Sequence, residues 1–162
     1  MKSLNESVNE YKKMLAAGDV QRAYRGIVHY MAKLRIHFES AYPQYTVSGA
    51  IYQGFMDMTY FAIAPDAFKK AKLKIGIVLM YQPLRFEVWL FGINRPVQAK
   101  YLAHFQGRKQ AKPHWKKENA DSIIEAVLVE QPDFDRLEAL TRQIESGTIH
   151  FLREMQEELE LS

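Results

Sequence analysis

The stretch from Leu73 to Ile93, LKIGIVLMYQPLRFEVWLFGI, decides the fold. It contains two apolar runs, LKIGIVLMY at 73–81 and RFEVWLFGI at 85–93, with Gln82-Pro83 between them. The first run is apolar at odd and even positions alike, which is typical of a strand buried on both faces. Because Gln82-Pro83 marks a turn, the two runs are predicted to pair as an antiparallel hairpin.

Further elements are predicted on both sides of this hairpin. Apolar residues recur at helical spacing before it, whereas the segment AIYQGFMDMTYFAI has the composition of a strand, with Gly54 as a bend or bulge. Asn94 is a candidate N-cap for the helix that follows the hairpin. Gly147 is expected to break or kink the last helix. The predicted helices are 4–16, about 20–41, 94–105 and 133–159, and the predicted strands are 50–63, 73–81, 85–93 and 122–129.

This order of elements, α-α-β-β-β-α-β-α, predicts an α/β (α+β) fold. The strands are expected to form a mixed four-stranded sheet with the helices packed on it, because a helix separates the last two strands. The length of 162 residues favours a single domain, 1–162. Its predicted parts are a helical pair at 4–41, a sheet with a crossover helix at 50–129 and an acidic C-terminal helix at 133–160.

Composition excludes several classes of site. The chain has no cysteine, which rules out disulfides, thiolate nucleophiles and cysteine-bound metals. The N-terminus is polar, and no apolar run reaches the roughly 18 residues of a membrane span, so a cytoplasmic chain with no membrane partner is expected. Residues 1–117 carry 19 Lys and Arg against 7 Asp and Glu, whereas residues 118–162 carry 3 against 12. Such asymmetry fits either a nucleic-acid surface or an acidic helix that lies against a basic remainder.

Motifs with a known mechanism are missing from the sequence. It has no G-x-S-x-G, P-loop or Rossmann pattern, and its five histidines show no H-x-x-x-H spacing. No metal and no cofactor are therefore expected, and the sequence leans away from an enzyme. The leading hypothesis is a domain of otherwise unknown function that binds a small anionic ligand or a protein partner. A second copy, paired through the C-terminal helix, is one such partner.

Two acids are placed among large apolar residues. Alternation along a strand puts Asp57 on the same face as Thr59 and Phe61, and Glu87 lies within the second run of the hairpin. An unpaired carboxylate is costly in such surroundings, so both acids need partners. One interpretation is a pair of structural salt bridges, or acids that lie on a solvated face of the sheet. The other is a catalytic or binding pocket that Asp57 and Glu87 form with Lys74.

A ligand site is predicted where the hairpin ends. Asn94 and Arg95 lie between the end of a strand and the start of a helix, where the free N–H groups of the helix favour an anion. Arg95 can clamp a carboxylate or phosphate with two parallel hydrogen bonds. Tyr52 and Trp89 are the aromatic residues expected to complete this site. The alternative is that Asn94 only caps the helix and Arg95 pairs with an acid.

The segment 108–117 is basic and contains one tryptophan. Lysine and arginine with an interleaved aromatic ring suit single-stranded nucleic acid, because bases stack on the ring and phosphates meet the cations. An exposed loop without a ligand is the alternative. The candidate nucleic-acid residues are Arg108, Lys109, Lys112, Trp115 and Lys116.

Several stretches resemble a family of bacterial proteins whose domain has no known function. They are QRAYRGIVHYMAKLR, IYQGFMDMTYF, KLKIGIV, RFEVWLFGINRPVQAKY and PDFDRLEALT, and together they cover most of the chain. The element order is also distantly similar to restriction-endonuclease-like folds, which implies a divalent-metal nuclease-like hydrolase as an alternative function. Trp89 stands where those enzymes place a lysine, and the strand 73–81 has no carboxylate, so that resemblance implies a degenerate relative.

Overall fold

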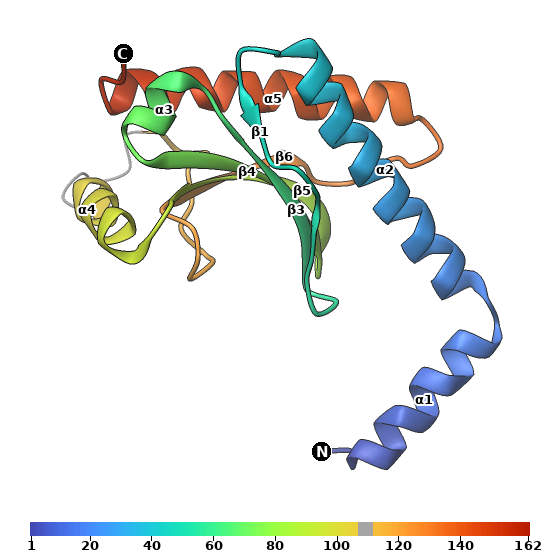
Figure 1. Ribbon diagram of the computed structural model, residues 1–162. Coiled ribbons are helices and arrows are strands. Elements are labelled where there is room, and N and C mark those ends of the chain that lie inside the picture. The colour runs from blue at the N-terminus through green and yellow to red at the C-terminus, as the bar shows by residue number, and fades with distance from the viewer. Residues whose placement is uncertain (107–111) are drawn as a thin grey trace.

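The computed structural model describes residues 1–106 and 112–162. The chain begins with two helices, continues through six strands interrupted by two helices, and ends with a long helix (Figure 1). The elements in chain order are α1 (Leu4–Ala16), α2 (Asp19–Ala41), β1 (Thr46–Val47), β2 (Tyr52–Gln53), β3 (Met58–Ala64), α3 (Asp66–Lys70), β4 (Leu73–Tyr81), β5 (Leu84–Gly92), α4 (Arg95–Gln106), β6 (Ile124–Val129) and α5 (Leu137–Glu158).

The predicted hairpin forms the middle of the sheet. Strands β4 and β5 pair antiparallel from Leu73 opposite Gly92 to Tyr81 opposite Leu84. Gln82 and Pro83, joined by a cis peptide bond, form the connection between them. Among the described residues the sheet has six strands in the order β1-β3-β4-β5-β6, with β2 paired to β3 beside β1. The prediction of an α/β chain built on this hairpin is confirmed.

The predicted mixed four-stranded sheet is wrong in two respects. All described strand pairs are antiparallel, including β5 with β6, because the chain leaves the sheet at Gly92 and returns opposite Leu90, at the same end. Helix α4 is therefore not a parallel crossover. The predicted strand 50–63 is also divided, since a turn at residues 54–57, with Met56 at a φ of 64°, separates β2 from β3.

Helices α2 and α5 lie on one face of the sheet, and the hydrophobic core lies between them and the sheet (Figure 1). The apolar side chains of both helices recur at helical spacing, and those of the strands at every second position, so that each element presents one apolar face. The buried residues of this core include Tyr30, Met31, Leu34 and Phe38 from α2, Ile75, Ile77, Phe86, Val88 and Leu90 from the hairpin, and Leu140, Ile144, Phe151, Leu152 and Met155 from α5.

Gly147 does not end α5, contrary to the expected break. The helix is continuous through it, and an added Cβ there would lie 2.7 Å from Leu128 Cδ2 of β6. The glycine therefore allows helix and strand to approach closely. Because the apolar side of α5 is buried against its own sheet, the homodimer predicted through this helix would have to use the exposed side, and it stays a prediction.

A carboxylate joins the two core helices. Glu145 of α5 accepts hydrogen bonds from the Tyr42 hydroxyl at 2.7 Å and from His37 Nε2 at 2.8 Å. Burial by itself would raise the pKa of Glu145, but these hydrogen bonds and the nearby His37 outweigh it, so the pKa is lowered. Burial and the same carboxylate raise the pKa of Tyr42 to about 12. The ionised form of Glu145 is thus the one that stabilises the contact.

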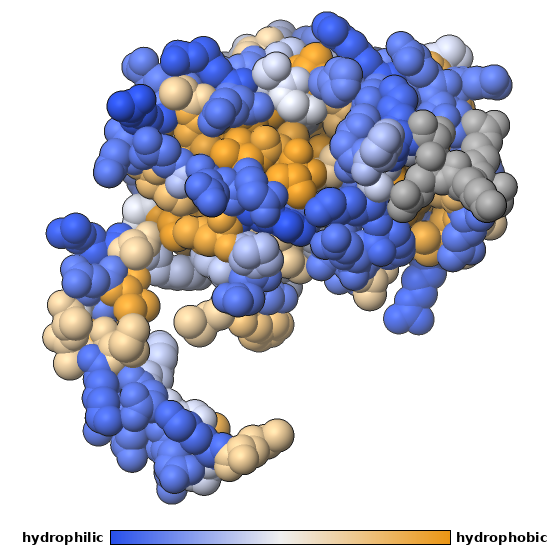
Figure 2. All heavy atoms as spheres, turned by 180° about the vertical axis from the view of Figure 1, so that it is seen from behind, coloured by the Kyte–Doolittle hydropathy of each residue, from blue (hydrophilic) through white to orange (hydrophobic). Residues whose placement is uncertain are grey.

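Helix α1 projects from the rest of the molecule (Figures 1 and 2). Ser3 and Glu6 form a reciprocal capping box at its start, but none of its side chains is buried. Leu4 and Met14 of its apolar stripe are exposed. The helix is held by local capping and propensity more than by the core. None of the helices in the described part of the chain combines the length and the apolar content needed to cross a bilayer.

The contrast between α1 and α2 gives a test of stability. Leu34 of α2 is buried, so Leu34→Ala would leave a cavity in the core. We expect this substitution to lower the free energy of unfolding by about 2–5 kcal/mol. Leu4→Ala in α1 should change it by less than about 0.5 kcal/mol, because Leu4 is exposed. Urea unfolding followed by circular dichroism measures both. Equal losses in the two variants would contradict this division of the structure.

The contact at Glu145 gives a test in pH. Because the folded pKa lies below the ordinary carboxyl value of 4.5, the contribution of Glu145 to stability is present above that value and is lost as the pH falls further. We expect Glu145→Gln to cost roughly 1–2 kcal/mol near pH 6, and the difference from the wild type to shrink toward pH 3. Chemical unfolding at several pH values measures this difference. Glu138→Gln, an exposed change on the same helix, is the control, and a difference that stays constant with pH would refute the assignment.

Candidate functional site: an aromatic pocket on the second face of the sheet

A pocket lies on the face of the sheet that α2 and α5 leave uncovered. Side chains alternate across a strand, so the residues between the core positions of β3, β4 and β5 point to this face. The pocket has a volume of about 190 Å³. Half of its eight lining residues are aromatic and two are acids. The lining residues are Tyr52, Asp57, Met58, Tyr60, Val78, Trp89, Phe91 and Asp121.

Three aromatic rings follow one another along this wall. The ring centroids of Tyr52 and Tyr60 are 5.0 Å apart, and those of Tyr60 and Phe91 are 6.1 Å apart at 84°. Phe91 lies against Gly76 of β4, where an added Cβ would be 2.6 Å from the ring. The ammonium of Lys74 lies 5.1 Å from the Phe91 centroid. Phe91 therefore already has a cation against its ring.

Asp57 reaches the pocket from a tight turn. Its Oδ1 accepts a hydrogen bond from the N–H of Met58 at 2.8 Å, and its carbonyl accepts one from the N–H of Tyr81. A Cβ on Gly54 would lie 2.2 Å from the same Oδ1, so only glycine leaves room for the carboxylate. The predicted strand face is wrong, because Asp57 precedes β3 and lies on the side of Tyr60. Among the described residues it forms no ion pair.

Asp121 comes from the segment that leads into β6. Gln98 of α4 holds this segment: its Oε1 accepts from the N–H of Gly92 at 2.8 Å, and its Nε2 donates to the carbonyl of Asp121 at 3.0 Å. The end of β5, the start of α4 and the start of β6 are thereby tied together. Within the described part of the chain, the carboxylate of Asp121 also lacks an ion-pair partner.

The two carboxylates make the pocket negative. Burial raises the pKa of Tyr60, and the neighbouring Tyr52 and Asp121 raise it further. Burial also raises the pKa of Tyr81; the hydrogen bond between Tyr81 and Thr59 opposes this shift, and the charge of Asp57 adds to it. No lysine or arginine among the described residues lines the pocket. The field in the pocket therefore favours a positive group.

Glu87 is a structural acid and does not line the pocket. It is 2% exposed; its Oε1 accepts from Arg85 Nε at 2.6 Å and its Oε2 from Trp89 Nε1 at 2.7 Å. Arg85 also reaches Glu118 at 3.2 Å and Glu130 at 3.4 Å. Of the two interpretations left open by the sequence, the structural ion pair describes Glu87. The same contact holds the Trp89 indole, which lines the pocket.

The other predicted ligand residues are divided between the pocket and its surroundings. Tyr52 and Trp89 line it, together with Asp57, whereas Asn94 and Arg95 do not. Asn94 is the N-cap of α4, as expected, since its Oδ1 accepts from the N–H of Val97 at 3.0 Å. Arg95 is exposed. The anion site at Asn94 and Arg95 stays a prediction.

The predicted nucleic-acid residues are dispersed. Arg108 and Lys109 lie outside the described residues. Trp115 is only 2% exposed and its indole N–H donates to Glu154 at 3.0 Å, so the expected exposed stacking ring is corrected to a core side chain. Lys112 also contacts Glu154, at 3.0 Å, and Lys116 lies 3.5 Å from Glu118. Three of the five residues are therefore engaged within the chain.

Five of the eight lining residues were missed from the sequence, among them Phe91, Tyr60 and Asp121. Phe91 had a signal, because alternation places it on the face of Trp89. Tyr60 was missed because the predicted alternation placed Asp57 on the opposite face of the strand, away from Tyr60. Asp121 had none, because it follows an irregular segment without periodicity, and only Gln98 brings it to the pocket.

Comparison with known proteins agrees with the resemblance seen in the sequence. The family model of the domain of unknown function DUF7000 matches residues 4–159, and the chain belongs to this family. No curated protein and no solved structure matches it. The predicted membership of an uncharacterised domain family is confirmed, whereas the distant likeness to restriction-endonuclease-like folds stays a prediction.

The buried pair at Glu87 can be tested by removing its cation. We expect Arg85→Met to lower the free energy of unfolding by about 3–5 kcal/mol, because a buried carboxylate is left without its partner. Arg95→Met, an exposed change of the same kind, should have an effect below about 0.5 kcal/mol. Adding Glu87→Gln to Arg85→Met should recover part of the loss. Thermal and urea unfolding give these values; no recovery in the double variant would argue against the pair.

Proposed function

We propose that the aromatic pocket binds a small organic cation with an ammonium head group. The composition of the pocket lining carries the proposal. The lining combines four aromatic residues with two acids and contains no described lysine or arginine. These residues are Tyr52, Tyr60, Trp89, Phe91, Asp57 and Asp121. The protein is then a binding domain. Its ligand has the opposite charge to the anion that the helix start at Asn94 and Arg95 suggested.

The aromatic rings supply one part of the recognition. The face of an aromatic ring carries partial negative charge, and a cation within about 6 Å of its centroid gains roughly 0.5–2 kcal/mol. Tyr52, Tyr60 and Phe91 stand side by side at 5.0 and 6.1 Å between centroids, so one ammonium group can contact more than one ring. The position of Lys74 over Phe91 supports this affinity of the wall for a cation.

The carboxylates supply the other part. Asp57 and Asp121 have no described ion-pair partner, so a bound cation would be the first group to neutralise them. Asp57 is already held by the N–H of Met58, and the segment of Asp121 by Gln98, so little conformational freedom is lost on binding. A volume of about 190 Å³ limits the ligand to a small head group.

The geometry favours binding over the divalent-metal hydrolase. That alternative requires Asp57 and Glu87 to share an ion. Glu87 lies outside the lining, and both of its oxygens already accept hydrogen bonds, from Arg85 and from Trp89. Only Asp57 of that pair faces the pocket.

Choline is a suitable probe, because its trimethylammonium group is compact and permanently charged. We expect calorimetric titration to show binding, and neohexanol, its uncharged carbon isostere, to bind at least about tenfold more weakly. Tyr52→Leu removes an aromatic ring and Asp121→Asn removes a carboxylate. Each variant should weaken choline binding by about three- to tenfold.

The matched control is Asp66→Asn, an exposed acid on α3 outside the pocket, which should leave binding unchanged. Thermal melting of each variant confirms that it is folded. The proposal is lost if choline and its uncharged isostere bind equally, or if Asp66→Asn weakens binding as much as Asp121→Asn does.

A further inference from the structure

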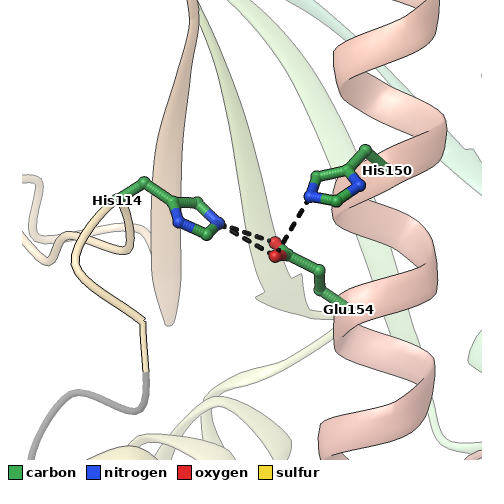
Figure 3. A group of neighbouring side chains, drawn as sticks. All are labelled: His114, His150 and Glu154. Carbon is green, nitrogen blue, oxygen red and sulfur yellow. Dashed lines mark hydrogen bonds and ion pairs between the residues drawn. The ribbon is translucent and has the colours of Figure 1, made fainter.

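A second group of polar residues lies away from the aromatic pocket, where the segment after residue 111 meets α5. His150 and Glu154 stand one helical turn apart on α5, and His114 approaches from the opposite segment (Figure 3). His114 Nε2 is 3.0 and 2.9 Å from the two carboxylate oxygens of Glu154, and His150 Nε2 is 3.2 Å from Oε1. Two imidazoles therefore converge on one carboxylate.

We propose that His114, His150 and Glu154 form a binding site for a divalent transition metal, with Zn²⁺ as the best fit. Imidazole nitrogen and carboxylate oxygen are ligands that zinc takes in proteins, at about 2.0–2.2 Å. Ligand atoms around a tetrahedral zinc are then about 3.3 Å apart. The potential ligand atoms of the three residues all lie within 4.8 Å of one another, so small side-chain rotations bring them to that spacing.

The carboxylate is held in place from behind. Glu154 is 5% exposed, and its Oε2 accepts a hydrogen bond from the buried indole of Trp115 at 3.0 Å. Groups that orient a metal ligand in this way contribute strongly to affinity. The histidines are open to water by contrast, with side chains 48% exposed in His114 and 69% exposed in His150. An ion can therefore reach the site from solvent while its least mobile ligand stays fixed.

Lys112 is the competitor for this position. Its ammonium lies 3.0 Å from Oε1 of Glu154, the oxygen that both histidines also approach, and 5.6 Å from the centre of the Trp115 ring. In the absence of a metal ion, the ammonium group of Lys112 and the surrounding N–H donors thus stabilise the buried carboxylate. The lysine side chain is 38% exposed, so it can move into water when a metal ion takes its place.

Three protein ligands leave one position of a tetrahedral zinc open. Water or a small anion would occupy it. The site also joins two parts of the chain that are otherwise far apart in sequence, since His114 precedes β6 and His150 belongs to α5. Metal binding would therefore strengthen the attachment of the segment that contains Trp115 to the C-terminal helix.

The test is calorimetric titration of the metal-free full chain with Zn²⁺, together with Co²⁺ as a spectroscopic substitute. We expect one equivalent of Zn²⁺ to bind, and the Co²⁺ form to show the intense visible absorption of tetrahedral coordination. His114→Ala and His150→Ala should each lower the affinity at least about tenfold. Lys112→Met should raise it about three- to tenfold, because a competing positive charge is removed.

The matched control is His29→Ala, an exposed histidine on α2 far from this group in sequence, which should bind Zn²⁺ as the wild type does. All changed side chains in these variants are at least partly exposed, and circular dichroism confirms their fold. Binding that is equally weakened by His29→Ala and His150→Ala would show adventitious surface histidines only. Absence of binding, or a lower affinity in Lys112→Met, would likewise overturn the proposal.

Discussion

The burial of the β4–β5 hairpin on both of its faces is the constraint on which the rest of the structure depends. One face is covered by α2 and α5, whose apolar stripes match it. The other face carries Val78 and Trp89, which are also buried, yet no long helix of the described chain lies over them. Aromatic side chains and the segment before β6 must cover this face instead. Because such a cover is discontinuous, it leaves a pocket.

Buried acids fix the position of that cover. Glu125 of β6 lies opposite Trp89 and accepts hydrogen bonds from the N–H of Glu118 at 2.9 Å and from Asn119 Nδ2 at 3.0 Å. Glu87 on the neighbouring strand holds the Trp89 indole and Arg85. The burial of a carboxylate costs little free energy only when both of its oxygens accept hydrogen bonds from such donors. The segment that carries Asp121 is therefore placed by polar contacts as much as by apolar packing.

The sequence predicts what depends on local pattern and misses what depends on distant contacts. The hairpin, the helices and the Asn94 cap follow from periodicity and capping, and all are present. The bend expected at Gly54 is present, but the sequence did not show that residues 54–57 divide the strand, because Met56 adopts a positive φ that a methionine does not signal. Trp115 stands among lysines in the sequence, yet its partner Glu154 lies on another element. The spacing of His150 and Glu154 on one helix was visible, but His114 joins them only through the fold.

The opposite charges of the two parts of the sequence have a structural counterpart. Arg85 meets Glu118 and Glu130, His37 meets Glu145, and Lys112 meets Glu154. In each pair the base comes from residues 1–117 and the acid from the acidic remainder, so part of the basic excess is neutralised inside the chain and is no argument for nucleic acid. Asp57 and Asp121 take no part in these ion pairs: no described cation pairs with either, and both line the aromatic pocket. Both carboxylates are exposed, so a cation from solvent can reach them in this pocket without displacing a described partner.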